Sequence, residues 1–254
     1  KICKDVRFYA EDMAGNKSTK DFCINGPWLK FRGEGIVRGN QNIDMIAESD
    51  EHNTDSLIEI GGTNINFFTS SRNWIMKNSV QPDDSTFANL LSLVGSYTTI
   101  SGPLVTTSGI YYINGDYEIN NSNLPNDYDN ITFDQLVFID GNLLITENIE
   151  VSEDSTAMFI VSGKVEVEKK VDTLGVAVIT DQDFYSAYDV TEGETTKTLD
   201  YNGIYMADKF YFQRTLQGTN NQKDPSDNFI FEPKYLIQLR SYFGKYNIIW
   251  RSVE

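Results

Sequence analysis

Carboxylates are the only groups with catalytic or metal-binding chemistry that this sequence holds in surplus. Asp140, Asp181 and Asp208 each follow a short apolar run, and Ser162 takes the same place in a further copy of the pattern. If these runs are strands that stack in register, the side chains form a row with about 4.8 Å between neighbours. Like charges at that spacing repel one another unless a cation, a basic neighbour or water compensates them.

Three kinds of chemistry fit such an acidic row. The residues can be turn-forming Asp side chains exposed to water, ligands of a Ca²⁺ site, or the carboxylate pair of a polysaccharide-cleaving enzyme. The calcium-loop pattern DxDxDG is absent, and NDYDN (126–130) and DPSDN (224–228) only partly replace it. Nothing singles out one pair among 37 acidic residues, so we predict no catalytic residues and keep Asp140, Asp181 and Asp208 as candidate Ca²⁺ ligands.

Other common sites lack the residues that they need. The single histidine, His52, lies in a loop-forming run, where we expect it to be solvated rather than to act as a general base. Neither the P-loop nor the dinucleotide-binding motif occurs. With Cys3 and Cys23 as the only cysteines, a zinc site cannot be completed from Cys and His ligands.

Cys3 and Cys23 lie at the base of a predicted β-hairpin. Residues 4–12 alternate between polar and apolar, residues 13–18 are typical of a turn, and residues 19–24 form the returning strand. Pairing across the hairpin brings the cysteines close together and predicts a disulfide that stabilises the fold by about 3 kcal/mol. Two reduced, buried thiols are the alternative. A disulfide would indicate an oxidising, extracytoplasmic compartment.

The acidic row belongs to a repeated unit of strand, short turn and strand. Its turns contain Gly115, Gly141, Gly163, Asp181 and Asp208, in steps of 18 to 27 residues. That spacing is typical of one coil of a β-solenoid, in which each coil buries its inward side chains against the next coil. The copies span residues 109–120, 136–146, 158–168, 175–185 and 203–212.

We therefore predict an all-β fold, a single-stranded parallel β-helix, and parallel crossovers favour a right-handed course. Residues 28–37 alternate like a strand, and a first coil is expected over residues 43–47 and 57–68. Apolar residues then recur at i, i+3, i+4 and i+7 across residues 87–94, which predicts a core-facing helical insertion. The repeats follow after this helix.

The C-terminal region is predicted to close the solenoid. Pro233 precedes a second helical pattern over residues 234–243, and residues 246–253 alternate like a strand. The last coil of a solenoid exposes an apolar cross-section. We therefore expect this helix and strand to form a cap on the terminal coil.

Composition limits the possible partners. Lys and Arg number 21 against 37 Asp and Glu, which gives a net charge of -16. Such a field repels phosphate backbones and anionic membranes, so we expect no nucleic-acid binding. No apolar run reaches the roughly 20 residues of a membrane span. Tyrosines that cluster around the repeats, where they face outward, offer a platform for sugars or for protein contacts.

The N-terminal hairpin resembles part of a bacterial Ig-like repeat. The string VRFYAEDMAGNKSTKDF, with Ala10, Asp12, Ala14, Gly15 and Asn16 around its turn, is similar to the last two strands of such repeats. The resemblance implies the end of an Ig-like domain whose other strands lie elsewhere, or a hairpin that completes the sheet of another chain. An isolated hairpin is marginal in water, which favours either arrangement.

The remainder resembles the β-helical modules of large predicted bacterial cell-surface proteins. The resemblance is carried by residues 26–40, 158–168, 212–216 and 231–239. It divides the chain into residues 1–26, the hairpin, and residues 27–254, the β-solenoid domain. It implies a location outside the cell or at its surface, and it implies no particular activity.

These observations favour a non-enzymatic, extracellular structural or adhesive module. The alternatives are a subunit of an extracellular filament assembled through the N-terminal hairpin, and a carbohydrate-active β-helix enzyme that acts on polysaccharide. The expected partners are other copies of the chain, neighbouring surface-protein domains or polysaccharide. Because the sequence begins in mid-strand without a Met, we expect it to be an internal piece of a longer or processed protein.

Overall fold

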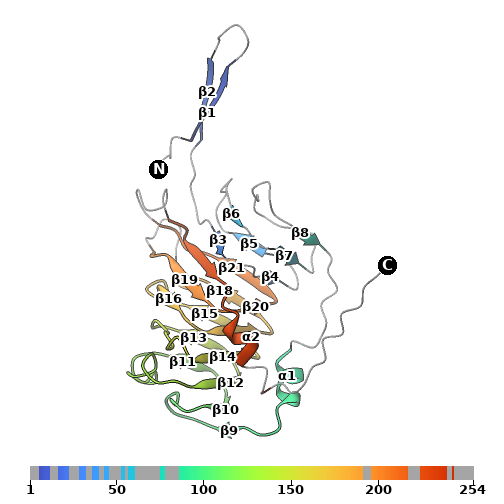
Figure 1. Ribbon diagram of the computed structural model, residues 1–254, viewed down its shortest axis with the longest axis vertical. Helices are drawn as coiled ribbons and strands as arrows, with labels where there is room; N and C mark the ends of the chain where they lie inside the picture. The colour runs from blue at the N-terminus through green and yellow to red at the C-terminus, as the bar shows by residue number, and fades with distance from the viewer. Residues whose placement is uncertain are drawn as a thin grey trace, which may run out of the picture.

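The computed structural model describes residues 86–190, 196–216, 224–238 and 242, and the backbone of strands between residues 6 and 77. It confirms the predicted β-solenoid, in which parallel strands stack into three sheets that form the walls of the coil (Figure 1). Cys3, Cys23 and His52 lie outside the described residues, so the disulfide and the solvated histidine stay predictions.

Each wall of the solenoid is one parallel sheet. The nine-stranded sheet contains, in order, β8 (Ile75–Lys77), β7 (Leu57–Ile60), β4 (Ile36–Gly39), β20 (Tyr205–Ala207), β17 (Ala177–Thr180), β14 (Thr156–Val161), β12 (Asp134–Asp140), β10 (Gly109–Asn114) and β9 (Thr98–Thr99). The six-stranded sheet contains β11 (Tyr117–Ile119), β13 (Leu143–Ile145), β15 (Val165–Val167), β18 (Asp183–Tyr185), β21 (Lys209–Phe212) and β5 (Ile43–Met45). The five-stranded sheet contains β16 (Thr173–Leu174), β19 (Leu199–Asn202), β22 (Asp227–Ile230), β3 (Leu29–Arg32) and β6 (Asn53–Thr54).

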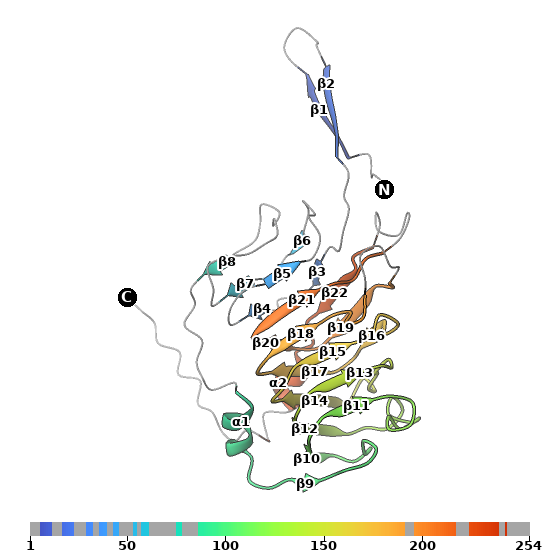
Figure 2. The same cartoon turned by 180° about the vertical axis from the view of Figure 1, so that it is seen from behind.

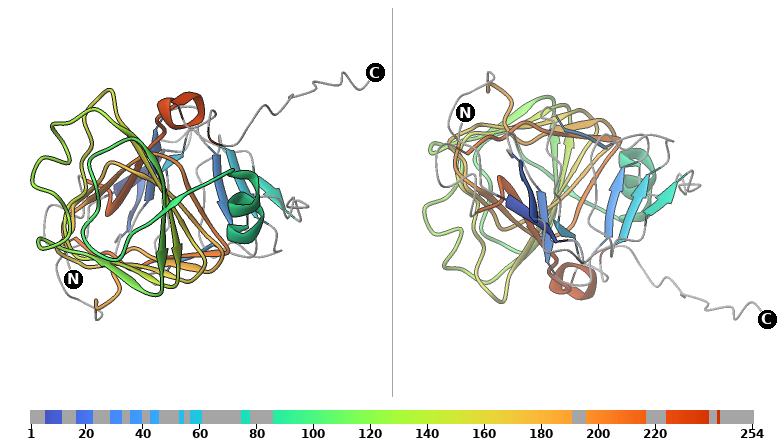
Figure 3. Two further views of the ribbon diagram at one scale, coloured as in Figure 1. Left: turned by 90° about the horizontal axis from the view of Figure 1, so that it is seen from below. Right: turned by 90° about the horizontal axis from the view of Figure 1, so that it is seen from above.

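The repeated sequence unit is the corner between two walls. Its first strand enters the nine-stranded sheet and its second strand enters the six-stranded sheet, as β12 and β13 do. The register aligns equivalent residues, so Ile139 of β12 pairs with Ile113 on one side and Val161 on the other. All three side chains are buried, and such columns form one continuous core. Viewed along the stack, the coils lie over one another (Figure 3).

Close stacking of the turns explains their small residues. Gly115, in the turn between β10 and β11, has a φ of 97°, a conformation that side chains other than Gly rarely adopt. A Cβ on Gly141, one coil further on, would overlap the backbone of Gly115 and Asp116. The turn glycines in the repeat are therefore a consequence of backbone approaching backbone.

The coils do not follow one another in chain order. The last coil of the repeats, formed by β20, β21 and β22, pairs with N-terminal strands β4, β5 and β3. The chain thus starts at one end of the stack and re-enters it at the other end through β9 (Figure 1). The expected first coil therefore lies beside the last coil of the repeats, because an edge of the stack accepts any strand of matching register regardless of its place in the chain.

Both helices of the described residues cover the side of the stack, and neither lies over its end. Helix α1 (Phe87–Leu93) begins at the N-cap residue Thr86, as the apolar spacing predicted, and buries Phe87 against the nine-stranded sheet. Helix α2 (Lys234–Gln238) buries Tyr235 against the same sheet and contacts β14. The C-terminal helix therefore does not cap the terminal coil as expected, because the N-terminal strands already occupy that position.

Two loops close the opposite end of the core. Leu104 from one loop and Tyr128 from the other are buried in the main core cluster, and the Leu104 N–H donates to the Asn123 carbonyl at 2.8 Å. The Asn123 amide also donates to the carbonyl of Glu118 in the edge strand β11. This bond satisfies a carbonyl on an edge that would otherwise be open to strand addition.

The N-terminal hairpin is present as predicted. Strands β1 (Val6–Glu11) and β2 (Lys17–Phe22) pair antiparallel, with Val6 opposite Phe22. Among the described strands they form a sheet of their own. The Ig-like assignment of residues 1–26 and the domain boundary before residue 27 stay predictions.

Candidate functional site

The acidic row follows the corner between the nine-stranded and the six-stranded sheet. Register and hydrogen bonds align Asp140 with Ser162 in the next coil, and Ser162 with Asp181 in the coil after it. Asp208 lies in the corresponding turn of the following coil, where its N–H donates to the Gln182 carbonyl at 3.0 Å. The predicted stacking of these turns is confirmed.

The carboxylates of Asp140 and Asp181 accept hydrogen bonds from other parts of the fold. The Asp140 carboxylate accepts hydrogen bonds from the Tyr112 hydroxyl at 2.8 Å and from the Ser162 hydroxyl at 3.0 Å. The bond to Asp140 is the main reason that the pKa of Tyr112 is raised to about 12. Asp181 Oδ1 accepts the backbone N–H of Phe87 at 2.8 Å, so this carboxylate holds the first turn of α1.

The chemistry available to the row follows from these partners. Desolvation beside α1 raises the pKa of the Asp181 carboxyl, and the hydrogen bond from Phe87 opposes that shift. Among the described residues, no three His, Cys, Asp or Glu side chains are close enough to hold one metal ion. The row therefore presents single carboxylates in separate environments, and Ca²⁺ binding by Asp140, Asp181 and Asp208 stays a prediction.

One further carboxylate lies inside the solenoid. Asp227 is fully buried and accepts hydrogen bonds from the Tyr201 hydroxyl at 2.8 Å and the Ser226 hydroxyl at 3.1 Å. Burial raises its pKa to about 6, while the positive charge of Arg214 acts in the opposite direction. Because the carboxyl is shielded from solvent, no dissolved substrate can reach it in this state.

Arg214 explains how a buried charge is accommodated at a solenoid corner. Its guanidinium is fully buried and donates to the carbonyls of Ser186 at 2.8 Å, Lys197 at 3.0 Å and Glu168 at 2.9 Å. These carbonyls belong to two neighbouring coils. Arg214 and Asp227 thus serve the fold, because buried charges are tolerated only where several hydrogen bonds satisfy them.

The outer side of the six-stranded sheet is a regular surface that no described helix covers. We call it the open face and define it by the outward residues of five strands. Figure 2 shows these strands, with α1 set apart from them on another side of the stack. Its outward strand residues are Glu118, Leu144, Glu166, Asp183, Tyr185, Lys209 and Tyr211, and the turn residues Asp116, Asn142 and Lys164 directly precede the first three strands.

Tyrosines on the open face are stacked on each other. The rings of Tyr185 and Tyr211 are parallel within 1°, with centroids 4.6 Å apart, and Lys209 Nζ lies 4.4 Å from the Tyr211 centroid. Each ring therefore has one face covered by the other ring, so the pair cannot form a flat platform for stacking sugars. Tyr111, Tyr201 and Tyr205, which the sequence also suggested for a platform, are buried in the core.

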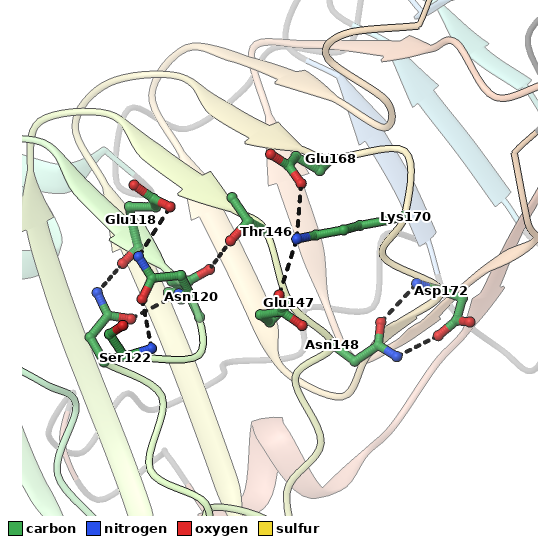
Figure 4. Close-up of polar contacts among 11 residues, drawn as sticks. Glu118, Asn120, Ser122, Thr146, Glu147, Asn148, Glu168, Lys170 and Asp172 are labelled. Atoms are coloured by element: carbon green, nitrogen blue, oxygen red, sulfur yellow. Dashed lines mark hydrogen bonds and ion pairs between the residues drawn. The ribbon is translucent and has the colours of Figure 1, made fainter.

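A polar corner borders the open face, where the six-stranded sheet gives way to the five-stranded sheet (Figure 4). Lys170 Nζ lies between Glu147 at 3.1 Å and Glu168 at 3.3 Å, which joins two coils. The Asn148 amide and Asp172 exchange hydrogen bonds across the same two coils. Such ladders fix the register between coils.

Fold and contacts together define this chain as a β-solenoid protein. No protein-family model matches the sequence, and no curated protein matches it. Among solved structures, a similar one is the crystal structure of an ice binding protein from an Antarctic biological consortium. The TM-score is 0.43 and the identity 10%, over 81% of this chain and 87% of that chain. The likeness concerns the β-solenoid fold alone.

The open face and the buried residues Arg214 and Asp227 were not predicted from the sequence. Leu144, Glu118 and Tyr211 carried a usable signal, since each lies between two inward apolar residues in a strand. Arg214 and Asp227 carried none, because burial of a charged residue follows from tertiary packing. In the described part of the chain, no helix is long and apolar enough to cross a bilayer.

Proposed function

We propose that the chain is a non-enzymatic structural or adhesive module of an extracellular surface protein. The proposal is supported by the contacts of the acidic side chains, which stabilise the fold. Asp181 holds α1, Asp140 bonds its neighbours in the stack, and Asp227 is sealed in the core. A rigid stack with an uncovered, side-chain-rich face suits contact with other molecules more than it suits turnover.

The enzymatic alternative can be tested directly. Purified chain is incubated with a panel of neutral and acidic polysaccharides, and released reducing ends and unsaturated products are measured. We expect no release above that of Asp140→Asn and Asp208→Asn variants. Turnover by the wild type that either variant abolishes would overturn the non-enzymatic proposal.

Location is tested on intact producing cells. A membrane-impermeant amine reagent should label Lys197, whose side chain is 73% exposed, before the cells are lysed. Peptide mass spectrometry identifies the labelled lysines, and a cytosolic protein serves as the control for leakage. Labelling only after lysis would contradict an extracellular location.

Filament assembly through the hairpin has one supporting observation. Strands β1 and β2 pair with each other and, among the described strands, with no other sheet, so their outer edges are available for strand addition. Electron microscopy and native mass spectrometry of the chain with and without residues 1–26 test this. Filaments that persist without the hairpin, or a strictly monomeric complete chain, would argue against it.

A further inference from the structure

An exposed aromatic ring lies at one end of the nine-stranded sheet. Tyr97 directly precedes β9, the last strand of that sheet in the described part of the chain, and its side chain is 47% exposed. Its ring stacks on the ring of Tyr112 from β10, with centroids 5.0 Å apart and 29° between the ring planes. One face of Tyr97 is therefore held against the fold, and no described strand lies beyond β9 to cover the other face (Figure 2).

The position of Tyr97 differs from that of the stacked tyrosines on the open face. Tyr185 and Tyr211 lie on neighbouring strands inside the six-stranded sheet, and both side chains are only partly exposed. Tyr97 lies at the edge of its sheet, so one face of its ring is turned to solvent. A single ring of this kind offers a flat apolar surface against which the C–H groups of a sugar can pack.

Hydrogen bonds between three coils hold the ring that supports Tyr97. The Tyr112 hydroxyl donates to Asp140 Oδ2 at 2.8 Å, and the Ser162 hydroxyl donates to Asp140 Oδ1 at 3.0 Å. These three residues come from β10, β12 and the turn after β14, which stack in register. Because the side chains are already ordered on rigid strands, binding of a ligand costs little conformational entropy here.

Two exposed polar side chains lie beside the stacked rings. Asn114 follows Tyr112 by two residues and so lies on the same outer side of β10, and it pairs in register with Asp140 of β12. Both side chains are exposed. An amide can donate and accept, and each Asp140 oxygen can accept a second hydrogen bond beside the one it has. The same surface therefore offers a ring for stacking and two groups that bind hydroxyls.

We propose that Tyr97, Tyr112, Asn114 and Asp140 form a binding site for a neutral polysaccharide of β-linked glucose units. The Tyr97 ring stacks on the C–H face of one sugar, and Asn114 and Asp140 bind hydroxyl groups of the chain. In β-glucose the ring substituents are all equatorial, which leaves both faces of the sugar flat enough to stack. The inference rests on the proposed adhesive function and names its ligand class.

Charge selects a neutral ligand for this site. Between Lys77 and Lys164, the stretch that contains all four residues of the site, the sequence has twelve acidic and no basic residues. Such a field repels an acidic polysaccharide. One stacked ring with two hydrogen-bonding groups gives weak binding, so a repeating chain that engages several copies of the module at once is the ligand that suits it.

Affinity electrophoresis of the full chain in native gels tests the site, because it detects weak binding. Gels that contain hydroxyethyl cellulose or a mixed-linkage β-glucan should retard the wild type. Tyr97→Ala should raise the dissociation constant about tenfold, since it removes the stacking surface, whereas Tyr97→Phe keeps the ring and should stay within about twofold. Asn114→Ala should raise it about threefold through the loss of one hydrogen bond.

Tyr188→Ala is the matched control. Tyr188 is 43% exposed, and its N–H donates to the Val167 carbonyl of the six-stranded sheet, away from the site. This variant should bind within about twofold of the wild type, and circular dichroism melts should show that all variants are folded. The acidic polymer polygalacturonate should not retard the wild type.

Several results would overturn the site. They are a wild type that no neutral β-glucan retards, a Tyr97→Ala variant that binds like the wild type, a Tyr188→Ala variant as weak as Tyr97→Ala, and retardation by polygalacturonate alone. A chain that is labelled on intact cells but binds no β-glucan would lose this site and keep the proposed extracellular function. Labelling only after lysis would instead contradict the proposed function.

Discussion

The outer sides of the nine-stranded and six-stranded sheets are both formed by parallel strands, but a helix covers part of the first and no described helix covers the second. Beneath α1 the outward side chains of the nine-stranded sheet are apolar, and Phe138 is fully buried against Phe87 of α1, with ring centroids 5.6 Å apart. On the six-stranded sheet the outward positions carry Glu118, Leu144 and Glu166, and no described helix covers them. Both faces come from the same repeat unit.

The difference shows that the backbone of a solenoid wall does not determine whether its outer side is covered. Only the side that faces the core is buried in every wall. Alternation places every second residue of each strand on the outer side. A column of apolar side chains there needs a helix to remove it from water, whereas a column of charges does not. The outward residues therefore decide which walls gain a cover and which stay available for partners.

The largest expected effect comes from the covered face. Phe138→Ala should lower the free energy of unfolding by about 3–5 kcal/mol, because it leaves a cavity between β12 and α1. Urea unfolding followed by circular dichroism measures the loss. A change below about 1 kcal/mol would show that α1 does not seal this face.

A smaller effect is expected at the start of the covering helix. Asp181→Ala removes the acceptor of the Phe87 N–H and should cost about 1–2 kcal/mol, with faster amide exchange in α1. Asp181→Asn keeps an oxygen acceptor and is the matched control. Equal losses in both variants would mean that the negative charge matters and the hydrogen bond does not.

The two sides should also differ in their response to pH. Desolvation raises the pKa of Asp181 beside α1, whereas the hydrogen bond and charge of Lys197 lower the pKa of Asp172 in the polar corner. Asp181 therefore contributes stability at low pH that is lost as pH rises through its folded pKa, and Asp172 contributes stability that is lost on acidification. Carboxyl carbon chemical shifts should give Asp181 the higher midpoint, and the reverse order would contradict the contrast.

The smallest effect is expected on the open face. Leu144→Ala should change the free energy of unfolding by less than about 1 kcal/mol, because the side chain is only partly buried and no described helix packs on it. The same urea series as for Phe138→Ala measures the change. A loss as large as that of Phe138→Ala would mean that another part of the chain covers this face.

Much of the fold could be predicted from the sequence. Turn residues such as Gly141 and Gly163, together with apolar alternation, indicated the coils, and spacing over residues 87–94 indicated α1. The order of the coils could not be predicted, because the pairing of Met206 with Arg38 leaves no local pattern in either segment. The same reason hid the position of α2, which depends on what occupies the end of the stack.

The candidate site was predicted less well than the fold. The acidic row was placed correctly because turns repeat at fixed positions of the coil. The partners of its members were not foreseen, since the N–H of Phe87 reaches Asp181 only through tertiary packing. The open face was not predicted from the sequence. Clusters of Asp and Tyr stand out by residue type, whereas the face is defined by the side of each strand on which a residue lies.

The out-of-order stack has a consequence for biosynthesis. Strands β3, β4 and β5 are made before the coil on which they rest, which ends with β22. These early strands therefore cannot complete their pairing as they emerge, and they must wait until β22 has been synthesised. Such late, long-range pairing is slow and leaves unpaired edges exposed meanwhile. Production of this protein should accordingly be sensitive to whatever holds the early segments soluble during that delay.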